Sequence, residues 1–217
     1  MMPIEKRRRQ ALEQIAEVKR ILCATEYALN NKAPATLLVT SAAQGEGKSL
    51  FAAALAAAAA QSGKFRVAAL DLNWYRPALH RFFALEQTHS SQEIGDAALG
   101  ALVCPSGEDA LDLLTAPYDY ADQSRLHGQA FTLPERLIKQ ARDAYDLVVI
   151  DSAAVFPTNR MMMDPVMLSG VVDGVVMVIM TGATPRQQVR KAQKIMETAG
   201  ANILGVVGNQ RQAATGR

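Results

Sequence analysis

Residues 36–62 read TLLVTSAAQGEGKSLFAAALAAAAAQS, and this stretch decides the fold. The apolar run at 36–40 contains β-branched residues and predicts a buried strand. The alanine-rich run at 47–62 predicts a helix, because alanine is the best helix former. A glycine-rich loop that ends in Gly-Lys-Ser lies between them, and this context is typical of a phosphate-binding loop.

The composition of this loop favours binding of nucleotide phosphates. Gly45 and Gly47 let the backbone curl so that successive N–H groups point at phosphate oxygens. The helix that follows directs the positive end of its dipole at the same site. Lys48 can bridge the terminal phosphates, and the Ser49 hydroxyl can bind Mg²⁺. The predicted nucleotide contacts are Gln44, Gly45, Glu46, Gly47, Lys48, Ser49 and Leu50.

One feature leaves room for an alternative without function. The usual motif begins with glycine, where this chain has Ala42. The alternative is a glycine-rich turn with an accidental Gly-Lys-Ser, and the agreement of loop, strand and helix argues against it.

Strands and helices alternate on both sides of this unit. Apolar strands are predicted at 66–72, 147–151, 174–180 and 203–207, and helices at 4–30, 77–83, 133–144, 161–170 and 185–199. Continuous apolar strands between helices predict an α/β fold with a doubly wound, mostly parallel sheet, the P-loop NTPase fold. Residues 86–130 show no clear pattern. We expect an N-terminal helical arm at 1–34 and a nucleotide-binding domain at 35–217.

Two acidic residues stand at predicted strand ends. Asp71 closes the strand after the alanine-rich helix, and Asp151 closes the apolar run at 147–151. Ligands of such sheets bind beyond the carboxyl ends of the strands. Both acids are therefore candidates to orient water or Mg²⁺ together with Ser49. The alternative is that each is a cap or turn former.

The loop at 41–49 and the segment DLNWYRPALHRFF at 71–83 together resemble the bacterial tyrosine kinase family of capsule and exopolysaccharide synthesis. That family belongs to the wider group of division-site and chromosome-partitioning ATPases. Its members have SAxPGEGKS, then DxDxRxPxxHxxF, then IDTPP. Residues 145–154 match the last segment, and 204–209 match a closing strand.

The resemblance implies catalytic and cofactor roles. Lys48 and Ser49 would bind ATP or ADP with Mg²⁺, and Asp71 would act as base toward the attacking hydroxyl. Asp151 would hold Mg²⁺ through water, with Ser49 and Asp71 as its other ligands, and Asn209 would lie at the adenine. It also implies a membrane polysaccharide co-polymerase (chain-length determinant protein) as partner, and a homo-oligomer.

Three departures from the family pattern bear on activity. Asn73 stands where the family has a second aspartate, which removes one negative charge from the metal site and predicts slow turnover. Ala153 and Ala154 replace the two prolines. The stretch after Asn209 has no tyrosine, so we expect no tail-based autophosphorylation. Tyr118 and Tyr120 are then the best remaining acceptors.

Composition excludes several classes of protein. The chain has 217 residues, a net charge of +2 and 49% hydrophobic residues, so it is too apolar to be disordered and gives no electrostatic case for nucleic acid. The apolar run at 50–60 is shorter than the ~20 residues that span a bilayer. We expect a cytoplasmic protein that reaches the inner membrane only through a partner.

Three functions stay open. The first is an ATPase or tyrosine-kinase-like phosphotransferase that regulates exopolysaccharide polymerisation and export. The second is a catalytically weak nucleotide-binding switch for a membrane polysaccharide co-polymerase. The third is a positioning ATPase of the partitioning class, whose members use a lysine where this chain has Ala43.

Overall fold

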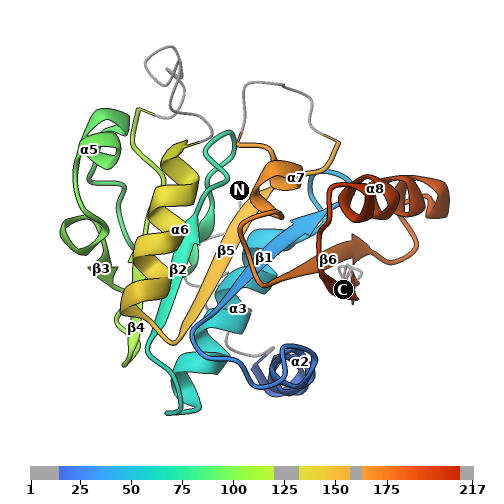
Figure 1. Ribbon diagram of the computed structural model, residues 1–217, viewed down its shortest axis with the longest axis horizontal. Coiled ribbons are helices and arrows are strands. Elements are labelled where there is room, and N and C mark those ends of the chain that lie inside the picture. The colour runs from blue at the N-terminus through green and yellow to red at the C-terminus, as the bar shows by residue number, and fades with distance from the viewer. Residues whose placement is uncertain (1–14, 120–131, 157–162, 211–217) are drawn as a thin grey trace, which may run out of the picture.

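The computed structural model describes residues 15–119, 132–156 and 163–210, and within them a seven-stranded sheet forms the centre of the molecule (Figure 1). The strands are β1 (Ala35–Ser41), β2 (Val67–Asp71), β3 (Cys104–Pro105), β4 (Leu111–Leu114), β5 (Leu147–Ala154), β6 (Gly174–Met180) and β7 (Ile203–Asn209). Their order is β3-β4-β2-β5-β1-β6-β7, and only β3 with β4 is antiparallel. The doubly wound, mostly parallel sheet is confirmed.

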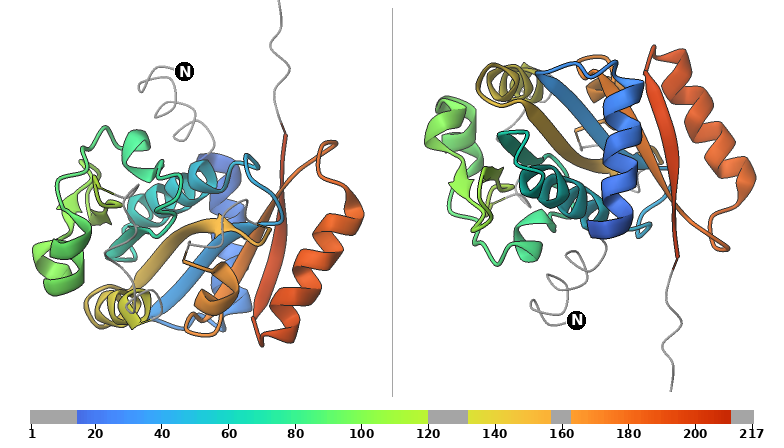
Figure 2. Two further views of the ribbon diagram at one scale, coloured as in Figure 1. Left: turned by 90° about the horizontal axis from the view of Figure 1, so that it is seen from above. Right: turned by 90° about the horizontal axis from the view of Figure 1, so that it is seen from below.

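Helices cover both faces of this sheet (Figure 2). They are α2 (Ile15–Ala28), α3 (Lys48–Gln61), α4 (Leu79–Phe82), α5 (Ser91–Asp96), the 3₁₀ helix η1 (Leu99–Ala101), α6 (Thr132–Ala144), α7 (Pro165–Leu168) and α8 (Arg186–Thr198). One face carries α2, α3 and α4, and the other carries α6, α7 and α8. Within the described ranges, no helix is both long and apolar enough to cross a membrane.

The strands supply side chains alternately to two cores. In β1, Leu37 and Val39 pack with α2 and α3, whereas Leu38 packs with the helices of the other face. In β5, Val149 joins the first core and Ile150 the second. This period of two is the pleat of a strand buried on both faces, as the continuous apolar runs predicted.

Helix α3 is buried on almost every side. All its residues from Phe51 to Ala60 are at most 7% exposed, and it lies between the sheet and α2. Alanine lets two helices and a sheet approach closely without a long side chain between them. The packing of Val18 and Leu22 of α2 in the same core joins the described part of the predicted arm to the domain.

The structure corrects the sequence-based element bounds in two places. The stretch 86–130 contains α5, η1, β3 and β4 in its described part, where the sequence offered only short apolar runs at 101–104 and 111–114 with no element assigned to them. The helix expected at 161–170 is confined to Pro165–Leu168 among the described residues. Residues 4–14 of the predicted N-terminal helix and Tyr120 lie outside the described residues.

Asp173 holds several segments of the chain together at the end of the sheet opposite the phosphate-binding loop. Its carboxylate accepts from the Thr36 amide at 2.9 Å, the Thr36 hydroxyl at 2.8 Å and Lys32 Nζ at 2.5 Å, and also from Arg142. Burial acts to raise the pKa of Asp173, but these four donors together hold it well below its ordinary value. The group therefore stabilises the fold above the pKa of an unfolded aspartate.

Asp173→Ala should lower the free energy of unfolding by about 2 kcal/mol at pH 7, because four donors lose a charged acceptor. The difference from wild type should shrink as the pH falls below about 4, where the unfolded carboxyl takes up its proton. Urea unfolding at both pH values measures this. Asp109→Ala, at an exposed loop position, is the control and should change nothing. An equal loss at both pH values would contradict the assignment.

Candidate nucleotide-binding site

The phosphate-binding loop joins β1 to α3, at the carboxyl edge of the sheet. Ser41 and Ala42 are held from the side by the chain after β5, since their carbonyls accept from the amides of Val155 at 2.8 Å and Phe156 at 3.2 Å. Gly45 and Gly47 have φ values of +79° and +92°, the left-handed conformation that glycine adopts without strain. The predicted role of these glycines in curling the loop is consistent with their backbone.

The first amides of α3 form a candidate site for an anion. Gly47 caps the helix and provides no side-chain acceptor for the amides that follow it. These groups have no intrahelical partner, and together with the helix dipole they form a site for a phosphate. Ser49 and Leu50, in this first turn, are half-buried.

Lys48 is buried at the start of α3, 7% exposed. Burial lowers the pKa of its ammonium group, and the negative charges of Asp151 and Glu46 act in the opposite direction. A buried ammonium group next to unpaired amides is the donor arrangement that polyphosphate requires.

Asp71 and Asp151 are brought together as register partners of β2 and β5. Neighbouring strands lie about 4.8 Å apart, so the two carboxyl groups are adjacent. Both residues are fully buried. Burial and the charge of Asp151 raise the pKa of Asp71 to about 8, although three amides act against it. Burial raises the pKa of Asp151 to about 6, which the charge of Lys48 partly opposes.

The two carboxyl groups differ in their partners. Asp71 accepts from the amides of Asn73 at 3.2 Å, Ala78 at 3.2 Å and Leu79 at 3.1 Å, so it also shapes the loop before α4. Both oxygens of Asp151 are buried and have no hydrogen-bond partner of normal geometry among the described residues, although the Ser49 hydroxyl is near enough to act against the rise of its pKa. Such an orphaned carboxylate is unusual in a folded protein and fits a cation or its water ligands.

The remaining predicted residues divide between the loop and its support. Asn209 ends β7, and its Nδ2 donates to the Glu46 carbonyl at 3.0 Å. A Cβ on Gly47 would lie 2.1 Å from that nitrogen, so any other residue would displace the Asn209 side chain and would also strain a backbone with a φ of +92°. Asn209 thus lies against the loop itself. The side chain of Asn73 donates to the Arg76 carbonyl at 3.2 Å.

No described group of three or more His, Cys, Asp or Glu side chains is placed to hold a metal. A magnesium ion at this edge would depend on Ser49, the two aspartates and the phosphate oxygens of the nucleotide. That is the usual way Mg²⁺ binds, with one or two carboxylates and substrate phosphates.

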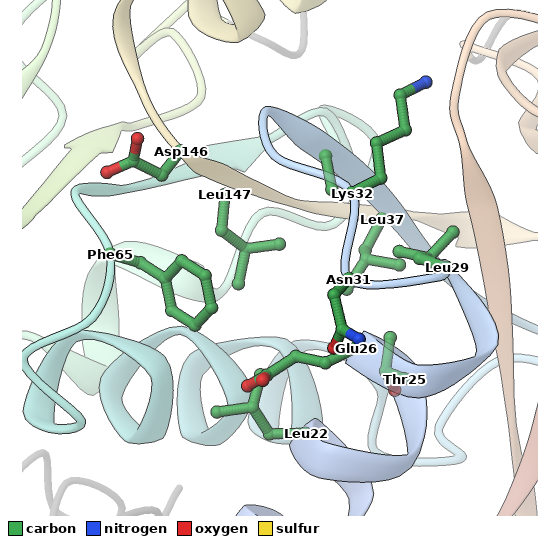
Figure 3. Close-up of a pocket in the computed structure, with 11 residues that line it drawn as sticks. Leu22, Thr25, Glu26, Leu29, Asn31, Lys32, Leu37, Phe65, Asp146 and Leu147 are labelled. Carbon is green, nitrogen blue, oxygen red and sulfur yellow. The ribbon is translucent and has the colours of Figure 1, made fainter.

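A separate cavity of about 110 Å³ lies at the amino end of the strands, between α2 and the sheet (Figure 3). Phe65 and Leu147 lie on one side of it and Leu22 on the other, while the Lys32 ammonium points away. None of the predicted site residues lines it. The functional site is therefore assigned from the loop and the strand ends, and this cavity is distinct from it.

Sequence reasoning missed the residues that support the loop from β6 and from the turn after it. The Met180 amide donates to a Glu46 carboxylate oxygen at 3.1 Å, and the Thr184 hydroxyl donates to the same oxygen. Thr184 is 138 residues from Glu46 in the chain and belongs to no motif, so the sequence carried no signal for it.

Comparison with known proteins gives the family. No protein-family model matches the sequence. The chain is 31% identical over 189 residues to the tyrosine-protein kinase YwqD of Bacillus subtilis (strain 168), which is 86% of this chain and 77% of that protein. It is 30% identical over 178 residues to the succinoglycan biosynthesis transport protein ExoP of Rhizobium meliloti (strain 1021), which is 80% of this chain and 22% of that protein.

The fold has a close match among solved structures. The kinase domain of the Escherichia coli tyrosine kinase ETK superposes with a TM-score of 0.77 at 23% identity, over 94% of this chain and 78% of that one. The chain therefore belongs to the bacterial tyrosine kinase family, as a tyrosine-kinase-like phosphotransferase on the P-loop ATPase fold.

Proposed function

We propose that the chain binds ATP with Mg²⁺ and transfers its terminal phosphate, to water or to a tyrosine hydroxyl. The observation that carries this is Asp151, whose buried carboxylate lies near Lys48, Ser49 and the uncapped start of α3 and has no hydrogen bond of normal geometry among the described residues. A buried charge without a partner is costly, so its presence argues for a ligand that compensates it.

Each residue then has a role. The amides of the loop and of Ser49 bind phosphate oxygens, and Lys48 donates to the terminal phosphates. Ser49, Asp71 and Asp151 would hold Mg²⁺, which when bound neutralises phosphate charge. Asp71 accepts the proton of the attacking hydroxyl, a role that its raised pKa favours near neutral pH. Gln44, Gly45 and Leu50 complete the phosphate cradle, and Asn209 lies on the adenine side.

The relatives support a proposal for the partner and the place in the cell. ExoP is a transport protein of which this chain matches only 22%, so a related domain forms part of a larger transporter there. We propose that this chain acts on a membrane polysaccharide co-polymerase, from the cytoplasm and through a homo-oligomer. The residues at 1–34 would act as an arm beside the nucleotide-binding domain at 35–217.

Two measurements test the proposed function. Calorimetric titration with ATP in the presence of Mg²⁺ should show binding at one site. Incubation with γ-labelled ATP, followed for released phosphate and for labelled protein, separates hydrolysis from phosphotransfer. Tyr27 is 81% exposed and Tyr118 58% exposed. Label on this chain should map to the segment with Tyr118 and Tyr120 and be lost when both are replaced by phenylalanine, whereas Tyr27→Phe should keep it. Absence of ATP binding would refute the proposal.

A weak switch is the second candidate, and Asn73 is the observation that favours it. A neutral amide in place of a carboxylate leaves less negative charge beside Asp71 and Asp151. Such a protein would bind ATP and release phosphate slowly. The same labelled-ATP experiment distinguishes it from an efficient enzyme.

Asn73→Asp should tighten Mg²⁺ binding about 3- to 10-fold and raise phosphate release, because it adds a carboxylate ligand. It should also lower the melting temperature without nucleotide, since the hydrogen bond from the Asn73 side-chain amide to the Arg76 carbonyl is lost. Asn202→Asp is the matched control, because Asn202 also donates to a carbonyl, that of Asp173, away from the site. Unchanged rate and metal affinity would place residue 73 outside the metal shell.

A further inference from the structure

The side chain of Glu46 is occupied by protein donors although it lies inside the phosphate-binding loop. Glu46 is 2% exposed. Its Oε2 accepts from the Ala43 amide at 2.7 Å, and its Oε1 accepts from the Met180 amide at 3.1 Å and from the Thr184 hydroxyl. A carboxylate would repel phosphate, so its place in the loop needs a structural reason.

These donors come from two places that are distant in sequence. Ala43 belongs to the loop itself, so one oxygen closes the loop on itself. Met180 ends β6 and Thr184 lies in the turn before α8, so the other oxygen ties the loop to that turn. The side chain of Asn209 in β7 adds a further hydrogen bond, which it donates to the main-chain carbonyl of Glu46.

The loop needs such ties because of its glycines. Gly45 and Gly47 have positive φ, and an unanchored segment with two glycines samples many backbone conformations. Only the conformation with its amides turned inward binds phosphate. When the competent fraction falls, the observed affinity falls by the same factor.

We infer that Glu46 and Thr184 form a clamp that holds the phosphate-binding loop in its binding conformation, which makes Thr184 a positioning residue for nucleotide affinity. The inference rests on the proposed function for its affinity consequence. Thr184 acts only through Glu46 and is assigned no contact with the nucleotide.

The test uses three variants of the full chain. Thr184→Val removes the hydroxyl and keeps the shape, Thr184→Ser keeps the hydroxyl, and Thr198→Val removes an exposed hydroxyl at the end of α8 as control. Calorimetry with MgADP should give a Kd about 10-fold higher for Thr184→Val. The other two variants should stay within about twofold of wild type. In phosphate release, KM for ATP should rise while kcat stays unchanged.

Amide hydrogen exchange of residues 42–51 without nucleotide provides a second readout. Exchange should be faster in Thr184→Val than in Thr184→Ser, because the loop opens more often. If Thr184→Val unfolds, Thr184→Ala replaces it in both measurements. Wild-type affinity and exchange in the valine variant, or equal losses in the serine variant, would overturn the inference. If wild type binds no MgADP, the proposed function fails, and exchange alone still decides on the clamp.

Discussion

Lys48→Met should weaken MgATP binding about 100-fold and abolish measurable phosphotransfer. Methionine keeps most of the length and the apolar contacts of the lysine stem, but it removes the ammonium group. A charge-assisted hydrogen bond to phosphate contributes about 1.5–3 kcal/mol, and Lys48 can make more than one. Burial disfavours the Lys48 charge whereas Asp151 and Glu46 favour it, so removal of the ammonium group should change the stability of the nucleotide-free protein only slightly. Calorimetry and thermal unfolding without nucleotide measure the two effects.

Lys64→Met is the matched control for this substitution. Lys64 has a side chain 62% exposed and forms only a long ion pair of 3.5 Å with Glu26. Its loss should leave ATP affinity unchanged. If Lys48→Met bound MgATP like wild type, the nucleotide would have to lie elsewhere, and the site assignment would be wrong.

Asp151→Asn should lower phosphotransfer by about 100-fold or more while it stabilises the empty protein at pH 8. The amide has nearly the same shape but cannot carry the charge. Folding raises the pKa of Asp71 to about 8 and that of Asp151 to about 6, whereas both lie near 4 in the unfolded chain. Between about pH 4 and these raised values, the folded state therefore binds more protons than the unfolded state. Stability of the wild type is therefore fullest below pH 4 and falls as the pH rises toward 8.

The variant removes the part of that fall that Asp151 itself contributes, and it also removes the charge that helps to raise the pKa of Asp71. We expect similar melting temperatures for wild type and Asp151→Asn at pH 5. At pH 8 the variant should gain on the order of 1–3 kcal/mol, or roughly 3–8 °C. Asp143→Asn, at an exposed position of α6, should follow the wild type at both pH values. A variant less stable than wild type at pH 8 would show that Asp151 is satisfied within the protein and has no need of a ligand.

The core of the fold was predictable from the sequence because its signals are local. The glycine-rich loop, the alanine-rich helix and the continuous apolar strands each specify one element through neighbouring residues. The edge of the sheet was not predictable. β4 is only LDLL and β3 only two residues, and both gain their structure by pairing with a strand already in place.

The candidate site divides in the same way. Lys48, Ser49, Asp71 and Asp151 stand at strand and helix ends, so the α/β pattern alone predicts that they meet. The contacts of Glu46 could not be predicted, since they depend on a turn that the fold brings from the far end of the chain. The prediction that Glu46 contacts nucleotide is left to its backbone amide, because its carboxylate is taken up by protein donors.

The alanines of α3 have a mechanical consequence. This helix begins at the end of the glycine-rich loop and is about 21 Å long at 1.5 Å per residue, with α2 packed along its far side. Alanine has no side-chain torsion that could adjust, and a close-packed interior is hardly compressible. A small displacement of Lys48 therefore cannot be absorbed along the way, and α3 behaves as a rigid rod that carries it to α2 on the opposite surface.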